Sequence, residues 1–104
     1  MPVVRISLGR FDADILDAVR TRLAESQATL EPAIRAMTGS IAYYVALDER
    51  NLAMTNVSVW STLEDAERMG SLPAMNELGA SFAAMGVRFE RPITNHDVLW
   101  CLGA

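Results

Sequence analysis

The sequence lacks lysine altogether and contains a single cysteine, Cys101, and a single histidine, His96. Without lysine, the chain cannot form a Schiff base with a carbonyl substrate or attach pyridoxal phosphate covalently. A lone cysteine and a lone histidine cannot make a Cys/His zinc site within one chain, and a single cysteine excludes an intrachain disulfide. The sequence therefore predicts no metal site of this kind and leaves few covalent strategies open.

Concentrated positive charge and long apolar runs are also missing. The nine basic residues are all arginines spread along the chain, and the formal net charge is −4. Because no basic stripe could neutralise a run of phosphates, nucleic acid is not an expected partner. No apolar run approaches the roughly 20 residues that span a bilayer, and residues 1–8 alternate like a strand instead of forming a secretory signal. We expect a cytoplasmic protein with no membrane partner.

What is present is typical of one folded domain. The chain has 104 residues, of which 51% are apolar and 21% are charged. A domain of this size buries roughly two-thirds of the surface of its unfolded chain. We expect residues 1–104 to form a single domain around one core.

The first half of the chain predicts three strands and two helical pieces. Residues 3–8 alternate as a half-buried strand. Asp12 is suited to cap a helix that runs to about residue 28, and Pro32 to begin a second, shorter piece over 31–37. The next two strands are rich in β-branched and aromatic residues and flank a polar turn, which predicts a hairpin of residues 41–47 and 53–60.

Capping residues divide the helical part of the second half. Ser61 and Glu64 match a capping box at the start of a short helix over 62–69. Pro73 begins a further helix, which Gly86 ends in a left-handed conformation.

The end of the chain completes the order β-α-β-β-α-β. Residues 87–91 predict a short strand, and residues 93–102 predict the last strand. This order predicts a ferredoxin-like α+β fold, in which helices cover one face of a four-stranded antiparallel sheet. The other face is not strongly polar, so we expect a second copy to cover it in a homodimeric α/β barrel.

Residues 56–66, Asn-Val-Ser-Val-Trp-Ser-Thr-Leu-Glu-Asp-Ala, resemble a junction in antibiotic-biosynthesis-monooxygenase-like proteins, where a strand ending in Trp meets a Ser-capped acidic helix. Length and element order are similar to this dimeric α/β-barrel superfamily over essentially the whole chain. The resemblance indicates the fold more than the function. The superfamily includes cofactor-free monooxygenases, haem-degrading enzymes, isomerases and proteins without an assigned role.

Asn56 and Trp60 match, in type and spacing, a pair with which some cofactor-free members hold a polycyclic phenol or quinol near dioxygen. Four residues apart on a strand, they share a face. The resemblance implies that Asn56 hydrogen-bonds a substrate oxygen and stabilises enolate charge, and that Trp60 packs on an aromatic ring. By residue type alone, a Trp at a strand end is more often a core or interface residue.

Haem-degrading relatives place an iron-binding histidine on the following helix, where this chain has Arg68, Met69 and Gly70. The resemblance therefore disfavours haem degradation and implies chemistry without a cofactor. His96 lies on another element and leaves haem or metal binding open. A solvated or backbone-capping imidazole is its simpler interpretation, and proton transfer is its candidate catalytic role.

Further candidates belong to the expected cleft between sheet and helices. Tyr43 and Tyr44 point to opposite faces of one strand, so one is expected in the pocket and the other at the dimer seam. Alternation alone does not say which. Met69 and Phe82 belong to an apolar wall that suits a flat ligand, or to the core.

Three arginines could offer a cation to an anionic substrate: Arg5, Arg88 and Arg91. Cross-strand pairing with Glu90 or Asp97 is the favoured interpretation.

Two hypotheses follow. The first is a homodimer that binds a small apolar or aromatic molecule and oxidises it with dioxygen as a cofactor-independent monooxygenase. The second is a non-catalytic dimeric binding or regulatory module that holds a metabolite in the same pocket.

Overall fold

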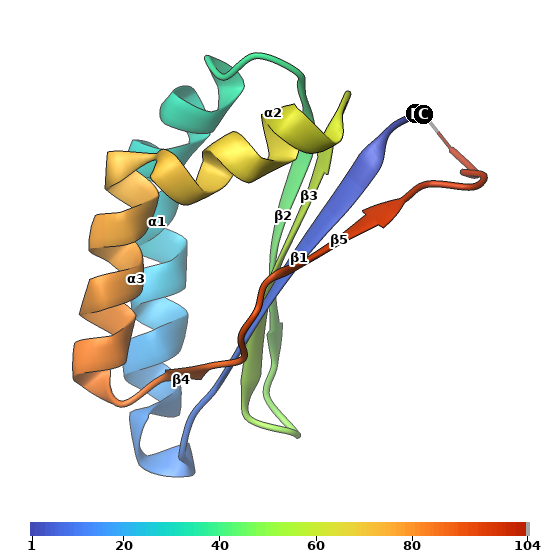
Figure 1. Ribbon diagram of the computed structural model, residues 1–104. Helices are drawn as coiled ribbons and strands as arrows, with labels where there is room; N and C mark the ends of the chain where they lie inside the picture. The colour runs from blue at the N-terminus through green and yellow to red at the C-terminus, as the bar shows by residue number, and fades with distance from the viewer. Residues whose placement is uncertain (104) are drawn as a thin grey trace.

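A computed structural model describes residues 1–103 and places all the helices on one face of an antiparallel sheet (Figure 1). Along the chain, the elements are β1 (Val3–Arg10), a 3-10 turn (Ala13–Ile15), α1 (Leu16–Arg35), β2 (Ser40–Asp48), β3 (Ala53–Trp60), α2 (Leu63–Arg68), a second 3-10 turn (Met69–Ser71), α3 (Pro73–Met85), β4 (Arg88–Phe89) and β5 (Thr94–Asp97).

The sheet has the order β2-β3-β1, and both β4 and β5 pair with the remaining edge of β1. All of these pairings are antiparallel. The fourth position of the sheet is thus divided between two short strands. The predicted ferredoxin-like α+β fold is confirmed.

Two buried clusters lie between the helices and the inner face of the sheet. One surrounds Trp60 and includes Val3 and Ile34; the other surrounds Phe82 and includes Met54. Leu78 of α3 packs against both clusters. A side chain on the inner face therefore points either into a cluster or into the space between them.

The expected break in the first helix is wrong, because α1 continues through Pro32 as one helix. Leu30 and Ile34, on either side of Pro32, are both buried in the Trp60 cluster. This burial stabilises the helix across the proline. Asp12 also does not cap the helix through its side chain, since its carboxylate faces Arg88 at 3.3 Å.

The predicted capping box lies one residue too early. Thr62 is the N-cap of α2, and its Oγ1 accepts a hydrogen bond from the Asp65 amide at 3.1 Å. The Ser61 amide instead donates to the Gly39 carbonyl at 2.9 Å, which keeps the chain extended for one more residue. The predictions for Pro73 at the start of α3 and for left-handed Gly86 at its end are confirmed.

The last strand is shorter than expected, because β5 ends at Asp97. The residues beyond it extend from the sheet, and Leu99, Trp100 and Leu102 are each more than four-fifths exposed (Figure 1). Their apolar content alone predicted a strand, but no neighbouring strand pairs with them among the described residues.

The outer face of the sheet carries no helix (Figure 1). One row across it joins Tyr44, Val57, Ile6 and Thr94 through neighbouring register positions on four strands. This face is apolar over β1 and β3 and open to solvent in the single chain. None of the helices in the part of the chain that the structure describes is both long and apolar enough to cross a membrane.

Candidate functional site

Two hollows lie between sheet and helices. The larger, about 640 Å³, lies between α1 and β2 and is called the α1–β2 groove. The smaller, about 330 Å³, lies between the inner face of β1 to β3 and helix α3 and is called the sheet–α3 pocket. Both reach the size range of small-molecule sites, so polar chemistry must decide between them.

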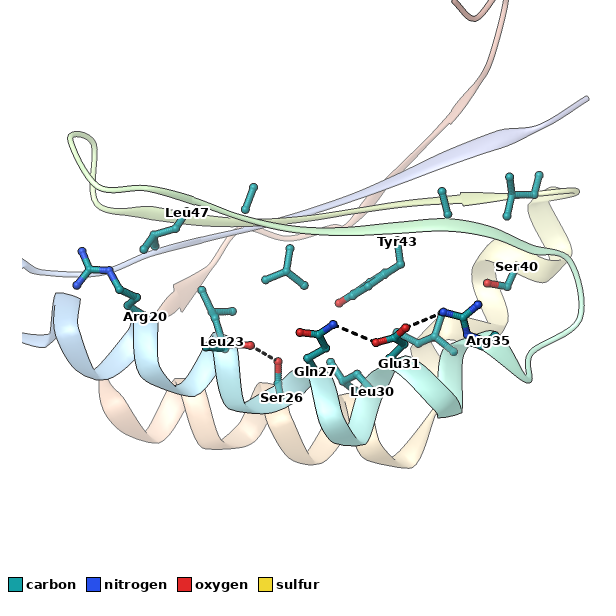
Figure 2. Close-up of a pocket in the computed structure, with 16 residues that line it drawn as sticks. Arg20, Leu23, Ser26, Gln27, Leu30, Glu31, Arg35, Ser40, Tyr43 and Leu47 are labelled. Carbon is teal, nitrogen blue, oxygen red and sulfur yellow. Dashed lines mark hydrogen bonds and ion pairs between the residues drawn. The ribbon is translucent and has the colours of Figure 1, made fainter. Parts of the chain in front are cut away.

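The polar groups of the α1–β2 groove bond mainly to one another (Figure 2). Glu31 accepts from Gln27 at 3.0 Å and from Arg35 at 2.6 Å, and Ser26 donates to the Leu23 carbonyl at 2.6 Å. Groups already paired in this way have little left to offer a ligand. The groove is therefore the weaker candidate.

Two residues that line the sheet–α3 pocket each carry a buried polar atom without a hydrogen-bond partner among the described residues. These atoms are the amide oxygen of Asn56 on β3 and the hydroxyl of Tyr43 on β2. Leaving such a group unpaired costs about 1–3 kcal/mol. A ligand hydroxyl that donates to the Asn56 oxygen and accepts from the Tyr43 hydroxyl would pair both atoms, which makes this pocket the candidate site.

The structure shows which of the two tyrosines faces the helices, a question that strand alternation left open. Tyr43 extends from β2 toward α1 and borders both hollows (Figure 2), whereas Tyr44 lies on the outer face and is 61% exposed. Burial raises the pKa of Tyr43 to about 12. Its hydroxyl therefore stays protonated at neutral pH and remains a hydrogen-bond donor.

Apolar side chains form most of the remaining wall. Met69 and Phe82, both predicted, line the pocket together with Met54 and Leu78. Gly79 of α3 also lines it, and a Cβ atom at this position would meet no atom within 4 Å. The pocket thus combines an apolar wall with a few polar groups, as small-molecule sites usually do.

Trp60 and His96 are not brought to this pocket. Trp60 shares the inner face of β3 with Asn56, as predicted, but it is fully buried in its core cluster and is not part of the lining. His96 pairs in register with Val4 on the outer face and is exposed. The structure therefore gathers Asn56, Tyr43, Met69 and Phe82, and leaves Trp60, Tyr44 and His96 elsewhere.

The sequence favoured ion pairing over ligand binding for Arg5 and Arg91, but both side chains line the pocket. The favoured ion pair with Glu90 is wrong for both, because Glu90 pairs with Arg10 at 2.9 Å. The third arginine, Arg88, pairs with Asp12. Only the folded register shows which arginines keep a carboxylate partner.

Acidic and metal-binding side chains are scarce around the site. The described residues that line the pocket include no histidine, aspartate or glutamate. Within residues 1–103, no group of three or more His, Cys, Asp or Glu residues is placed to hold a metal ion.

No protein-family model and no curated protein matches the sequence. Solved structures are similar over nearly the whole chain. A protein from Nitrosomonas europaea, provisionally assigned as an antibiotic biosynthesis monooxygenase, has a TM-score of 0.72 at 14% identity, over 98% of this chain and 94% of its own.

Two further structures are similar to the same extent. A protein from Deinococcus radiodurans with the same provisional assignment has a TM-score of 0.70 at 19% identity, over 100% of this chain and 98% of its own. SnoaB, a cofactor-independent oxygenase from Streptomyces nogalater, has a TM-score of 0.69 at 10% identity, over 99% and 98%. The chain therefore has the fold of the antibiotic-biosynthesis-monooxygenase-like proteins, as the junction at residues 56–66 indicated.

Proposed function

We propose that this protein is a homodimer in which each sheet–α3 pocket binds a flat aromatic, quinol-like molecule and oxidises it with dioxygen, without a cofactor. The amide oxygen of Asn56 carries the proposal, because it is buried in a largely apolar wall without a partner among the described residues. SnoaB, a cofactor-independent oxygenase, has the same fold, which supports the reaction class.

Two residues have chemical roles in this proposal. The amide N–H of Asn56 donates to a substrate oxygen and stabilises the negative charge that develops on it, while its oxygen accepts from a substrate hydroxyl. Tyr43, protonated at neutral pH, supplies a second donor. The substrate supplies all four electrons: a ring C–H becomes C–OH and the two quinol hydroxyls become quinone carbonyls, so that one oxygen atom enters the product and the other leaves as water.

The homodimer is supported by the uncovered apolar outer face of the sheet. Exposed apolar side chains on this face, among them Tyr44, would be removed from water by a second copy. The pocket lies on the opposite face, so dimerisation through the outer face does not cover it.

Oxygen uptake with a panel of quinols tests the proposal. The wild-type protein is expected to consume one O₂ per product formed, above the uncatalysed rate. Asn56→Ala is expected to lower turnover by roughly 100-fold or more, and Asn56→Leu, which keeps the volume but removes the amide, to do the same while remaining folded. Asn51→Ala, in the β2–β3 turn, is the matched control. Unchanged turnover in both Asn56 variants would rule out the role given to this amide.

A second candidate function is ligand binding without turnover. It is favoured by the absence of histidine, aspartate and glutamate among the described lining residues, because no side chain of these types is there to take a proton. Tight binding of a quinol with no oxygen uptake above the uncatalysed rate would favour this candidate over the first.

A further inference from the structure

We infer that the ligand of the sheet–α3 pocket is an aromatic carboxylate, whose carboxylate group is held by Arg5 and Arg91. The inference rests on the proposed function for the choice of pocket and adds the substrate class.

The charge of the pocket differs in sign from that of the chain. The protein has a formal net charge of −4. The described lining residues nevertheless include two arginines and no acidic side chain. Most of the other arginines form ion pairs with carboxylates, so two lining arginines without such a pair make this pocket locally positive.

Arg5 lies on the central strand β1 and reaches the pocket from the sheet. Its Nη1 is 3.5 Å from Asn95 Oδ1, at the limit of a hydrogen bond, and its Nη2 lies 3.6 Å from where a Cβ atom on Gly70 would be. It forms no ion pair with any described residue. Most of its N–H donors are therefore free for a ligand.

Arg91 reaches the same pocket from the segment between β4 and β5. Its guanidinium stacks over the Phe89 ring at 5.1 Å, and Nη1 donates to the Glu90 carbonyl at 3.3 Å. Within the described chain, it also lacks a carboxylate partner. Stacking on Phe89 restrains the side chain without using its charge.

Burial is the main cost of a charged Arg5 at this place. It lowers the pKa of Arg5; Glu67 raises this pKa in part, and the positive charge of Arg91 lowers it by a smaller amount. A carboxylate bound by both guanidiniums would offset the burial and the repulsion together. Its two oxygens also fit the forked donors of arginine better than one neutral oxygen does.

The rest of the lining decides what the carboxylate is attached to. Met54, Leu78 and Phe82 present apolar surface, and Asn56 and Tyr43 present isolated polar atoms. A flat ring system with a carboxylate at one end and a hydroxyl near Asn56 matches this arrangement.

Binding of 2-naphthoate, compared with its neutral methyl ester, tests the inference by calorimetric titration of the full chain at pH 7. The wild-type protein is expected to prefer 2-naphthoate. Arg5→Gln and Arg91→Gln are each expected to weaken naphthoate binding by about tenfold or more, since each removes a charged hydrogen-bond donor, and to leave ester binding unchanged. Arg50→Gln, exposed in the β2–β3 turn, is the control. Arg91 lies outside the strands, so its variant remains informative if Arg5→Gln fails to fold.

Equal affinity for acid and ester would overturn the inference, as would arginine variants that lose no more affinity than Arg50→Gln, or no binding of either probe. These outcomes are separable from failure of the proposed function. Arginine-dependent naphthoate binding without quinol oxidation would sustain the inference and contradict the oxidation. Oxidation of neutral quinols without any preference for the acid would do the reverse.

Discussion

The indole N–H of Trp60 donates a 2.8 Å hydrogen bond to the hydroxyl of Ser58, two residues earlier on β3, and both side chains are buried. This bond satisfies the one polar group of Trp60 inside the protein. Trp60 therefore fixes the end of β3 against α1 and α2, on the same face of the strand as Asn56.

Trp60→Phe is expected to lower the free energy of unfolding by about 1–3 kcal/mol, because Ser58 keeps a buried hydroxyl without this partner. Urea unfolding measures the change. Trp100→Phe is the matched control: Trp100 is 83% exposed, so the expected change is within about 0.5 kcal/mol. A Trp60→Phe protein that is as stable as wild type but no longer binds an aromatic ligand would place Trp60 at the ligand instead.

Tyr43 is expected to make stability depend on pH at high pH. Its pKa is about 12 in the folded protein and 10.0 as the reference for the unfolded chain. The neutral hydroxyl is thus favoured by folding: its contribution is fully present below pH 10 and is lost as the pH rises to about 12. Urea unfolding across this range is expected to show a steeper loss of stability in wild type and in Tyr44→Phe than in Tyr43→Phe. Equal slopes in all three proteins would contradict the burial of this hydroxyl.

The outer face of the sheet is expected to form the dimer interface. Val57 lies in the middle of this face, between Ile6 and Tyr44 in register. Light scattering at micromolar concentration is expected to give a dimer for wild type and a monomer for Val57→Asp, since the change buries a charge in an apolar contact. Leu63→Asp, at the exposed first position of α2, should remain a dimer. A monomeric wild-type protein would contradict the proposed assembly.

Single residues predicted the helix ends that depend on backbone geometry within one turn. Pro73 and Gly86 bound α3 as expected, because a missing amide and a positive φ act within one turn. The helix break predicted at Pro32 is wrong because tertiary burial of Leu30 and Ile34 outweighs the lost hydrogen bond. Where α1 ends is decided by packing, which no local pattern contains.

Some residues of the candidate site could likewise be predicted from the sequence, and others needed the folded structure. Asn56 was a candidate because it matches a residue pair in similar proteins, and Tyr43 and Tyr44 because alternation places one of the two on each face of the strand. The choice between Tyr43 and Tyr44 needed the position of the helices, which cover one face of the sheet alone. The roles of Arg5 and Arg91 depend on which arginine Glu90 reaches, and this follows from how β1 and β4 pair.

Filling each hollow in turn tests the central claim most directly. Gly79→Leu places a side chain in the open space of the sheet–α3 pocket, where no atom lies within 4 Å of the new Cβ, and leucine also favours a helix over glycine. Ala24→Leu does the same from α1 in the α1–β2 groove. We expect Gly79→Leu to abolish naphthoate binding and quinol oxidation in a folded protein, and Ala24→Leu to leave both intact. Loss of both in Ala24→Leu, with Gly79→Leu unaffected, would contradict the account.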